Sequence, residues 1–230
     1  MIAEDLLNGQ VFLIDKPLHW TSFQVVNKLR WTIKKKFNLK KIKVGHAGTL
    51  DPLATGLLII CTGKFTKRID EYQAQKKEYM GAFYLGATTP SFDLETEVNE
   101  HFPTKHINNE LINNTTKKFM GEIEQIPPIF SAIKKDGKRL YELARAGEST
   151  NIQSRKVTIS EFQITKINLP IIEFKVKCSK GTYIRSLAND FGEVLKSGAY
   201  LASLRRTKIG DFDVSKAKSI DEFLSFINDN

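Results

Sequence analysis

Two neighbouring segments of the chain, residues 155–168 and 171–179, alternate between apolar and polar side chains. In the second segment every other residue is apolar, as in Ile172, Phe174, Val176 and Cys178. A period of two is typical of a β-strand with one buried face, and Leu169-Pro170 is a suitable connection. We therefore predict an antiparallel pair of strands, which limits the chain to folds that contain a sheet.

Segments with helical periodicity separate this pair from the other expected strands. Further strands are expected over residues 10–15, 57–61, 76–85 and 200–206. Helices are expected over residues 63–73, 109–120, 140–146 and 183–196, and two more should begin after Thr21 and Ser219, which stand at the spacing of a helix cap. Residues 38–56 have little periodicity and read as a loop. This order predicts an α+β fold with a mixed, mainly antiparallel sheet flanked by helices.

Composition excludes several classes of protein. The chain has 230 residues, of which 41% are hydrophobic and 27% charged, as in an ordinary globular protein. It has no fixed repeat and no Gly/Ser linker, so we expect a single domain over residues 1–230. Two cysteines are too few for a disulfide scaffold, and no signal peptide or membrane span fits, so a cytoplasmic location is expected.

The charge balance favours a polyanionic partner. Lys and Arg number 35 against 26 Asp and Glu, which gives a net charge of +9. Much of the excess lies in two groups, one over residues 28–43 and one over residues 134–145. A solvated surface is the alternative explanation of such runs.

A glycine-rich loop, residues 45–56, carries one carboxylate, Asp51, and one imidazole, His46. Its three glycines permit unusual backbone angles and a close approach by a ligand. Spacing alone favours an ordinary surface turn with Asp51 as the turn residue, and a catalytic loop is the other interpretation.

An arginine, Arg185, lies where a strand ends and a helix begins. The first turn of a helix favours anions, so Arg185 would be better placed beside a carboxylate. If that carboxylate is Asp51, the pairing would keep it ionised and oriented, as a nucleophile or base requires. The alternative is an arginine on the surface.

Sequence patterns for cofactors and metals are absent. Gly63-Lys64 lacks the spacing of a phosphate-binding loop and is followed by Phe65 instead of Ser or Thr. The four histidines lack metal-ligand spacing, and no dinucleotide fingerprint occurs. We expect neither a cofactor nor a metal.

An ordered set of motifs resembles the TruB-type tRNA pseudouridine synthases. The motifs are Leu13-Ile14-Asp15-Lys16-Pro17, the loop over residues 45–56, Lys77-Glu78-Tyr79, the segment over residues 126–132, the segment over residues 140–145, the segment over residues 181–187, and Leu204-Arg205-Arg206-Thr207. The resemblance implies the pseudouridine synthase fold and isomerisation of uridine 55 in the T-loop of tRNA.

The resemblance also implies roles for single residues. Asp51 matches the essential catalytic aspartate, Tyr79 the tyrosine that stacks on the target base, and Arg185 the arginine that pairs with the aspartate. Substrate contacts are implied for His46, Tyr183, Leu204, Lys16, Gly48, Thr49 and Asp93. His46 would insert into the T-loop as the target nucleotide is flipped out. Stacking of His46 there would return part of the free energy that extruding the base costs.

The resemblance also implies contacts with RNA outside the loop over residues 45–56. An insertion at about residues 120–155 should grip the T-arm through phosphate contacts. No separate C-terminal RNA-binding domain is expected, and the lysine-rich stretch over residues 28–43 would compensate. The chain is expected to be a monomer. The alternative function is a tRNA-binding or folding module that is non-catalytic or depends on a partner.

Overall fold

The structure, a computed structural model, describes residues 2–131, 133–135, 137–147 and 151–229, with the backbone alone for 134 and 135. Part of the expected RNA-gripping segment, about 120–155, thus lies outside the described residues. The chain forms two compact units. Unit 1 contains residues 1–79 and 204–230, and unit 2 contains residues 80–203. Unit 1 is therefore built from two separate stretches of sequence.

The sheet of unit 1 has β3 (Ala54–Thr62) at its centre. On one side β3 pairs antiparallel with β1 (Val11–Lys16), and the short β2 (Val44–His46) pairs antiparallel with the end of β3 on the opposite side. On the other side it runs parallel to β12 (Ala199–Ile209), with Leu204 opposite Ala54, and β12 lies beside β4 (Lys77–Leu85). β13 (Phe212–Asp213) pairs with the end of β12.

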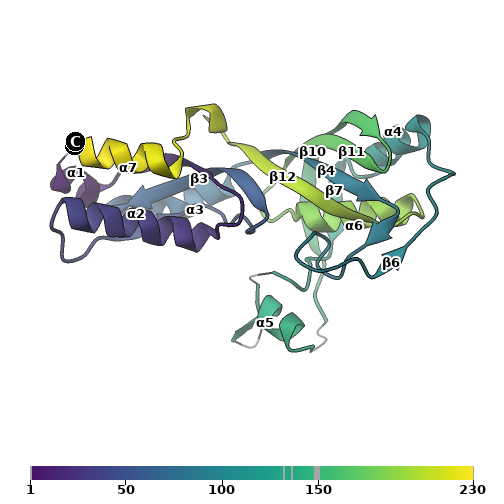
Figure 1. The fold of residues 1–230 in the computed structure, drawn as a ribbon, viewed down its shortest axis with the longest axis horizontal. Coiled ribbons are helices and arrows are strands. Elements are labelled where there is room, and N and C mark those ends of the chain that lie inside the picture. Colours follow the sequence, from purple (N-terminus) through teal and green to yellow (C-terminus); the bar gives the residue numbers. More distant parts are fainter. Residues whose placement is uncertain (1, 132, 136, 148–150, 230) are drawn as a thin grey trace. The chain divides into compact units, whose positions relative to one another are not determined.

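Helices cover both faces of this sheet. Helices α2 (Ser22–Lys36) and α7 (Ile220–Asp229) lie side by side (Figure 1) and bury Leu58 and Ile60 of β3 against their apolar faces. The alternate residues of β3, Leu57, Ile59 and Cys61, face α3 (Ile69–Ala74) and the 3-10 helix η1 (Gly63–Arg68). α1 (Ala3–Asn8) and the 3-10 helix η2 (Val214–Lys216) complete the unit. The continuous apolar run of β3 is thus explained by burial on both faces.

The sheet of unit 2 contains β4, β11 (Ile171–Cys178), β10 (Arg155–Asn168) and β7 (Gly121–Gln125) in that order. The predicted pairing of residues 155–168 with 171–179 is confirmed, since β10 and β11 are antiparallel from Ile159 opposite Cys178 to Asn168 opposite Ile171. Five phenylalanine rings from the sheet, α4 (Asn109–Lys118) and α6 (Ile184–Val194) form the core: Phe83, Phe119, Phe162, Phe174 and Phe191.

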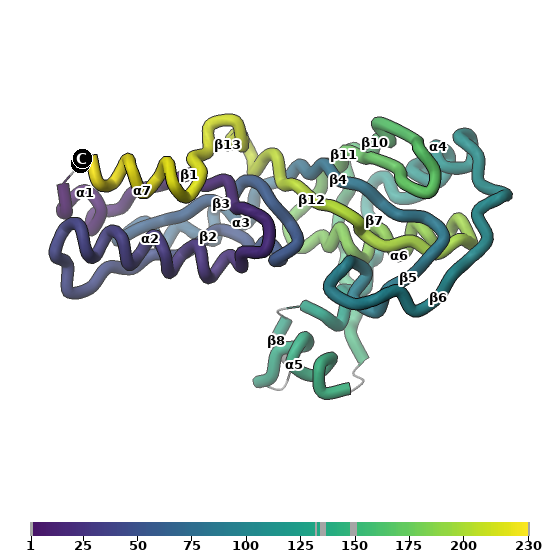
Figure 2. Tube along the Cα trace, viewed as in Figure 1, coloured from purple at the N-terminus to yellow at the C-terminus, as the bar shows by residue number. Residues whose placement is uncertain are grey.

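The remaining elements of unit 2 are small. β5 (Ala87–Thr88) pairs with β6 (Glu100–His101), and β8 (Lys134–Lys135) pairs with β9 (Lys138–Arg139). β8, β9 and α5 (Leu140–Arg145) form a segment that stands off the sheet of their own unit (Figure 2).

Most predicted elements are confirmed, and three predictions need correction. The predicted loop over 38–56 contains β2, and β3 begins at Ala54 instead of Leu57. The helix predicted over 63–73 is divided into η1 and α3. β7 was not expected, because Gly121–Gln125 is polar and mostly exposed, and it acquires strand structure by pairing with β10. The predicted α+β class with a mainly antiparallel, mixed sheet is confirmed.

Among the helices of the described residues, none is both long and apolar enough to cross a membrane. Both cysteines, Cys61 and Cys178, are buried free thiols.

Candidate active site

The predicted site residues are distributed over both units. Unit 1 contains seven of them: Lys16 at the end of β1, His46 at the end of β2, Gly48, Thr49 and Asp51 in the following loop, Tyr79 in β4 and Leu204 in β12. Asp93, Tyr183 and Arg185 belong to unit 2.

The loop that carries Asp51 is held through its backbone. Ser22, the first residue of α2, is buried, and its Oγ both donates to the Leu50 carbonyl at 3.0 Å and accepts from the Leu50 N–H at 2.8 Å. The Pro52 carbonyl accepts from the His19 N–H at 2.8 Å, and the Asp51 carbonyl accepts from the Ala54 N–H at 3.0 Å. These bonds fix the main chain on both sides of Asp51, so the loop is an ordered structure.

A buried arginine, Arg206, lies under the same loop. It is 1% exposed, and its guanidinium donates to the Leu57 carbonyl from Nε at 2.8 Å and to the Gly48 carbonyl from Nη2 at 3.0 Å. Gly56 lies opposite Arg206 in the β3–β12 ladder with φ +103°, and a Cβ there would stand 2.3 Å from the Arg206 carbonyl oxygen. Glycine at this position is therefore required by both the backbone angle and the close approach.

Lys16 places a second cation beside Asp51. Its side chain is fully buried, and Nζ donates to the carbonyls of Pro17 at 2.9 Å and Trp20 at 2.6 Å. Burial lowers the pKa of Lys16 from 10.5 to about 8, the Asp51 carboxylate opposes this shift, and the Arg206 cation adds to it. The structure thus brings Lys16, Asp51 and Arg206 into one electrostatic cluster.

His46 borders this cluster as a neutral imidazole. Burial lowers the pKa of His46 below its usual value, the Arg206 cation lowers it further, and a backbone hydrogen bond with Gly48 opposes the shift. Its Nδ1 is buried and has no hydrogen-bond partner among the described residues. A buried polar atom of this kind is suited to a contact with a bound ligand.

Tyr79 and Leu204 lie on neighbouring strands of the unit 1 sheet. Tyr79 is buried in β4, and Leu204 stands opposite Ala54, where the Asp51 loop enters β3. The Thr55 Oγ1 donates to the Leu204 carbonyl at 3.4 Å. The structure therefore places Leu204 beside the loop, on the strand that also carries Arg206.

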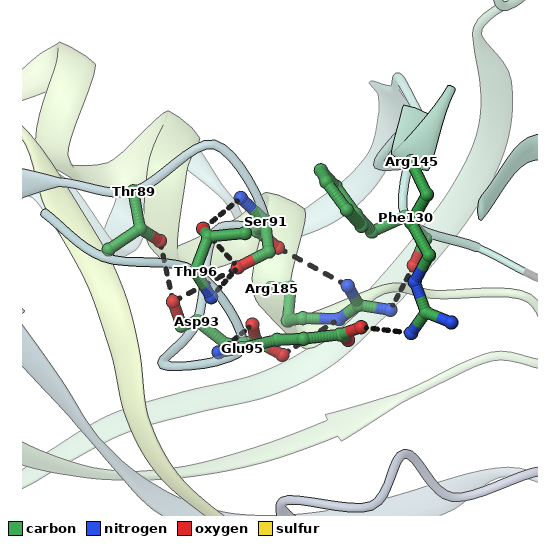
Figure 3. A network of polar contacts seen from close by, with 8 residues as sticks. All are labelled: Thr89, Ser91, Asp93, Glu95, Thr96, Phe130, Arg145 and Arg185. Carbon is green, nitrogen blue, oxygen red and sulfur yellow. Dashed lines mark hydrogen bonds and ion pairs between the residues drawn. The ribbon is translucent and has the colours of Figure 1, made fainter. Parts of the chain in front are cut away.

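In unit 2, Arg185 has the carboxylate partner that its position in the helix predicts. Its Nε lies 3.6 Å from Oδ2 of Asp93, and both side chains are buried. Its Nη1 donates to the Ser91 carbonyl at 3.2 Å and its Nη2 to the Phe130 carbonyl at 2.8 Å (Figure 3). The pairing of Arg185 with Asp51 stays a prediction.

The segment that carries Asp93 is itself densely hydrogen-bonded (Figure 3). Thr89 and Ser91 donate through their hydroxyls to the Asp93 carbonyl at 2.6 and 3.1 Å, and Asp93 Oδ1 accepts from the Glu95 N–H at 2.9 Å. Glu95 forms an ion pair at 2.8 Å with Arg145, which extends from α5. The network thus links α5 to the segment that holds Arg185.

Tyr183 is the residue that precedes α6. A side chain absent from the sequence prediction, Gln125 of β7, accepts from the Tyr183 N–H at 2.8 Å and donates to its carbonyl at 3.0 Å. Arg155 lies over the Tyr183 ring at 4.9 Å. Ser186 adds a bond of 2.7 Å to the Ile126 carbonyl, so the start of α6 is fastened to the end of β7.

Sequence reasoning missed Ser22, Arg206 and Gln125. Arg206 stands inside a recognised motif, but nothing in the sequence indicates that this arginine is buried. Ser22 and Gln125 act only on distant backbone atoms, which leaves no local signal. In the part of the chain that the structure describes, no group of three or more His, Cys, Asp or Glu side chains could hold a metal ion.

Comparisons with known proteins place this arrangement in a family. Residues 34–184 match the model of the TruB family pseudouridylate synthase N-terminal domain, and residues 185–229 match that of the tRNA pseudouridylate synthase B C-terminal domain. A tRNA pseudouridine synthase B from Flavobacterium johnsoniae is 67% identical over 97% of this chain and 98% of its own length. The protein of the same name from Chlorobaculum tepidum is 46% identical over 93% of this chain and 88% of its own.

Solved structures agree with this assignment. A chain of a Cbf5-Nop10-Gar1 complex gives a TM-score of 0.73 at 29% identity and covers 98% of this chain, which spans 56% of that chain. A chain of an H/ACA ribonucleoprotein bound to a substrate RNA that contains 2′-deoxyuridine gives 0.69 at 26% identity, with 96% and 54% covered. With two family models and close relatives over nearly its whole length, the chain belongs to the TruB family of pseudouridylate synthases and has their fold.

Proposed function

We propose that the chain isomerises uridine to pseudouridine at position 55 in the T-loop of tRNA, with Asp51 as the catalytic carboxylate. Isomerisation of uridine in tRNA follows from membership in the family. The reaction breaks the bond between C1′ of the ribose and N1 of uracil and forms a bond from C1′ to C5. C5 loses a proton and N1 gains one, so the product has the same atoms and needs no co-reactant.

The observation that carries the proposal is the setting of Asp51. Its loop is fixed through the neighbouring backbone, and the buried cations of Lys16 and Arg206 lie in the same cluster. Nearby cations attract a carboxylate and help to orient it, and a carboxylate serves as a nucleophile or a base. A rigid loop also keeps the carboxylate in one orientation while the ribose is bound.

The residues around the loop would receive the flipped nucleotide. Tyr79 would stack on the uracil and assist removal of the C5 proton, while Leu204 would line the pocket. His46, neutral and with its Nδ1 available, would enter the T-loop in place of the extruded base. Lys16, Gly48 and Thr49 would support binding of the nucleotide, and Tyr183 would contact it as well.

Arg185 would orient Asp51 by an ion pair. Asp93 would then be a positioning residue, because its carboxylate balances the Arg185 cation and the neighbouring carbonyls fix the guanidinium plane. For Asp93 the resemblance implies either an RNA contact or a structural role, and its burial beside Arg185 favours the structural one.

The same proposal covers the partner and the organisation of the chain. The segment at about 120–155 would grip the T-arm of tRNA within a single catalytic domain over residues 1–230. Its described side chains include the exposed cations Arg139 and Arg145, which stand over the Tyr141 ring. The protein would act as a monomer in the cytoplasm without a metal or cofactor.

The test is pseudouridine mapping on an unmodified tRNA transcript with the wild type and the Asp51→Asn variant. The substitution keeps the size of the side chain and removes its charge. We expect signal at uridine 55 with the wild type and at least a 1,000-fold lower rate with the variant, while tRNA binding persists, on the order of what removing a catalytic nucleophile costs. Asp70→Asn, at an exposed position of α3, is the matched control and should react as the wild type does.

Two results would contradict the proposal. Product formation by Asp51→Asn at the wild-type rate would exclude Asp51 as the catalytic group. A folded wild type that binds tRNA and forms no pseudouridine would favour the alternative, a tRNA-binding module that depends on a partner.

A further inference from the structure

A basic hollow lies in unit 1, outside the candidate active site. It has a volume of about 390 Å³ and brings together three stretches of sequence, the end of α1, the segment before β2, and η1. Four of the residues that line it are lysines, and all four are exposed: Lys41, Lys43, Lys64 and Lys67. The other lining residues are Leu7, Ile42, Gly63 and Thr66, so the lining has no carboxylate.

The charge of this basic hollow is not balanced by ion pairs. Among the ion pairs of the described residues, none includes any of the four lysines. Lys64 donates to the neutral Asn8 side chain at 2.8 Å, which fixes one ammonium group without neutralising it. Four positive charges around one depression create a potential that attracts an anion.

The backbone beneath the hollow is tightly constructed. Gly63 has φ +52°, and a Cβ there would stand 2.1 Å from the Leu7 carbonyl oxygen. The Gly63 N–H donates to the Lys43 carbonyl at 2.9 Å, and Thr62 Oγ1 donates to the Leu6 carbonyl at 2.9 Å. These contacts hold the lysine-bearing segments in a fixed arrangement.

The basic hollow is distant from the reactive loop. Asp51 is tied to Ala54 at the start of β3, whereas Gly63 follows Thr62 at its end. The eight residue steps between Ala54 and Thr62 span about 25 Å at roughly 3.3 Å per step. A nucleic acid that reaches both places must therefore extend well beyond the target nucleotide.

We propose that the basic hollow binds phosphate groups of tRNA that lie outside the T-arm. This inference rests on the proposed function, because it assumes that a tRNA occupies the Asp51 loop. Lysine ammonium groups are point charges that bind phosphates without reading bases, and the lining has no aromatic ring on which a base could stack. The hollow adds affinity for the whole tRNA and leaves the chemical step unchanged.

The experiment compares full-length tRNA with a T-arm hairpin as ligands. Lys41, Lys43, Lys64 and Lys67 are replaced together by Gln, and Kd is measured by fluorescence anisotropy over a series of salt concentrations. The matched control replaces four exposed lysines of unit 2, Lys105, Lys117, Lys118 and Lys196, by Gln, which changes the net charge equally. Thermal unfolding verifies that both variants are folded.

For full-length tRNA, we expect the first variant to bind at least 10-fold more weakly than the control. The magnitude of the slope of log K against log salt should fall by about 3, since each of the four lost phosphate contacts removes about 0.7–0.9 from it. For the hairpin, the affinity of the first variant and its rate of pseudouridine formation should match those of the control variant. If the fourfold variant does not fold, the pairs Lys41→Gln with Lys43→Gln and Lys64→Gln with Lys67→Gln should each show part of the effect.

Two results would overturn the inference. One is an unchanged Kd and salt slope for full-length tRNA, and the other is an equal loss for the hairpin, which would assign the hollow to the T-arm interface. Failure of the proposed function is a separate outcome, because it appears as absent hairpin modification by the wild type.

Discussion

The Asp51 loop of unit 1 and Arg185 of unit 2 are fixed in different ways. The bonds described for the loop go mainly to its main chain, from Ser22 and Arg206. Arg185 is held through its own guanidinium, by the Asp93 carboxylate and two carbonyls. A loop that is fixed through its backbone can present its side chains to the substrate, whereas an arginine that is fixed through its side chain serves as a rigid support.

This difference indicates which substitutions should unfold the protein and which should slow the reaction. Loss of a partner of Arg185 leaves a buried charge, which is an expensive defect. Loss of a bond to the loop backbone changes the orientation of Asp51 and costs less stability. The following predictions separate these two effects.

The largest effect is expected from Asp93→Asn. It removes the charge that balances the buried Arg185 cation, and we expect a loss of about 3–5 kcal/mol in the free energy of unfolding. Urea unfolding measures it. The double variant Asp93→Asn with Arg185→Met should recover much of the stability without recovering activity. An unchanged urea midpoint for the single variant would contradict the buried pair.

Ser22→Ala tests how the Asp51 loop of unit 1 is held. It leaves the N–H and carbonyl of Leu50 without their buried partner, at about 2 kcal/mol. We expect kcat to fall about 10-fold with little change in KM, because tRNA contacts are retained while Asp51 loses its orientation. Steady-state kinetics with Ser160→Ala, at an exposed position of β10, as the control would reveal this split. A rise in KM without a fall in kcat would contradict this prediction.

Lys16 gives a dependence on pH. Its pKa is lowered from 10.5 to about 8 in the folded chain, so between these values the unfolded chain binds a proton that the folded chain does not. The contribution of Lys16 to stability therefore rises as the pH increases through this interval, by about 1–2 kcal/mol between pH 7.5 and 9.5. Urea unfolding of the wild type relative to Lys16→Met should show that gain. Parallel pH curves would disprove it.

The smallest effect is expected from Arg145→Gln. The Arg145–Glu95 pair is solvent-exposed on the arginine side, with side-chain exposures of 65% and 31%. Such pairs contribute little, and we expect less than about 0.5 kcal/mol in urea unfolding. A loss above 1 kcal/mol would mean that α5 supports the Asp93 segment more strongly than this ion pair suggests.

Local signals in the sequence were sufficient for much of the fold. The Thr21 cap is confirmed, since its hydroxyl accepts from the Gln24 N–H at 3.0 Å and the Gln24 side chain accepts from the Thr21 N–H at 2.7 Å. The alternation that predicted β10 and β11 is visible in β11, where every second residue is buried. These features depend on residues close in sequence, so composition and spacing reveal them.

The supports of the candidate site could not be predicted in this way. Lys16 and Arg206 are charged residues that any pattern assigns to the surface, yet both are buried by strands that meet only in the folded chain. Similarly, Arg185 forms a buried ion pair with Asp93, 92 positions away, and no spacing rule links them. Motif resemblance predicted the reactive residues and gave no information about the backbone bonds that Ser22 and Arg206 supply to the Asp51 loop.

The divided sequence of unit 1 has a consequence for synthesis on the ribosome. The Asp51 loop is translated early, but the Arg206 guanidinium that anchors its Gly48 carbonyl arrives only after all of unit 2 has been made. A nascent chain that ends before β12 contains Asp51 and lacks the strand that carries Arg206. Unit 1 therefore cannot be completed from its amino terminus onward, because its last strand is made only after unit 2.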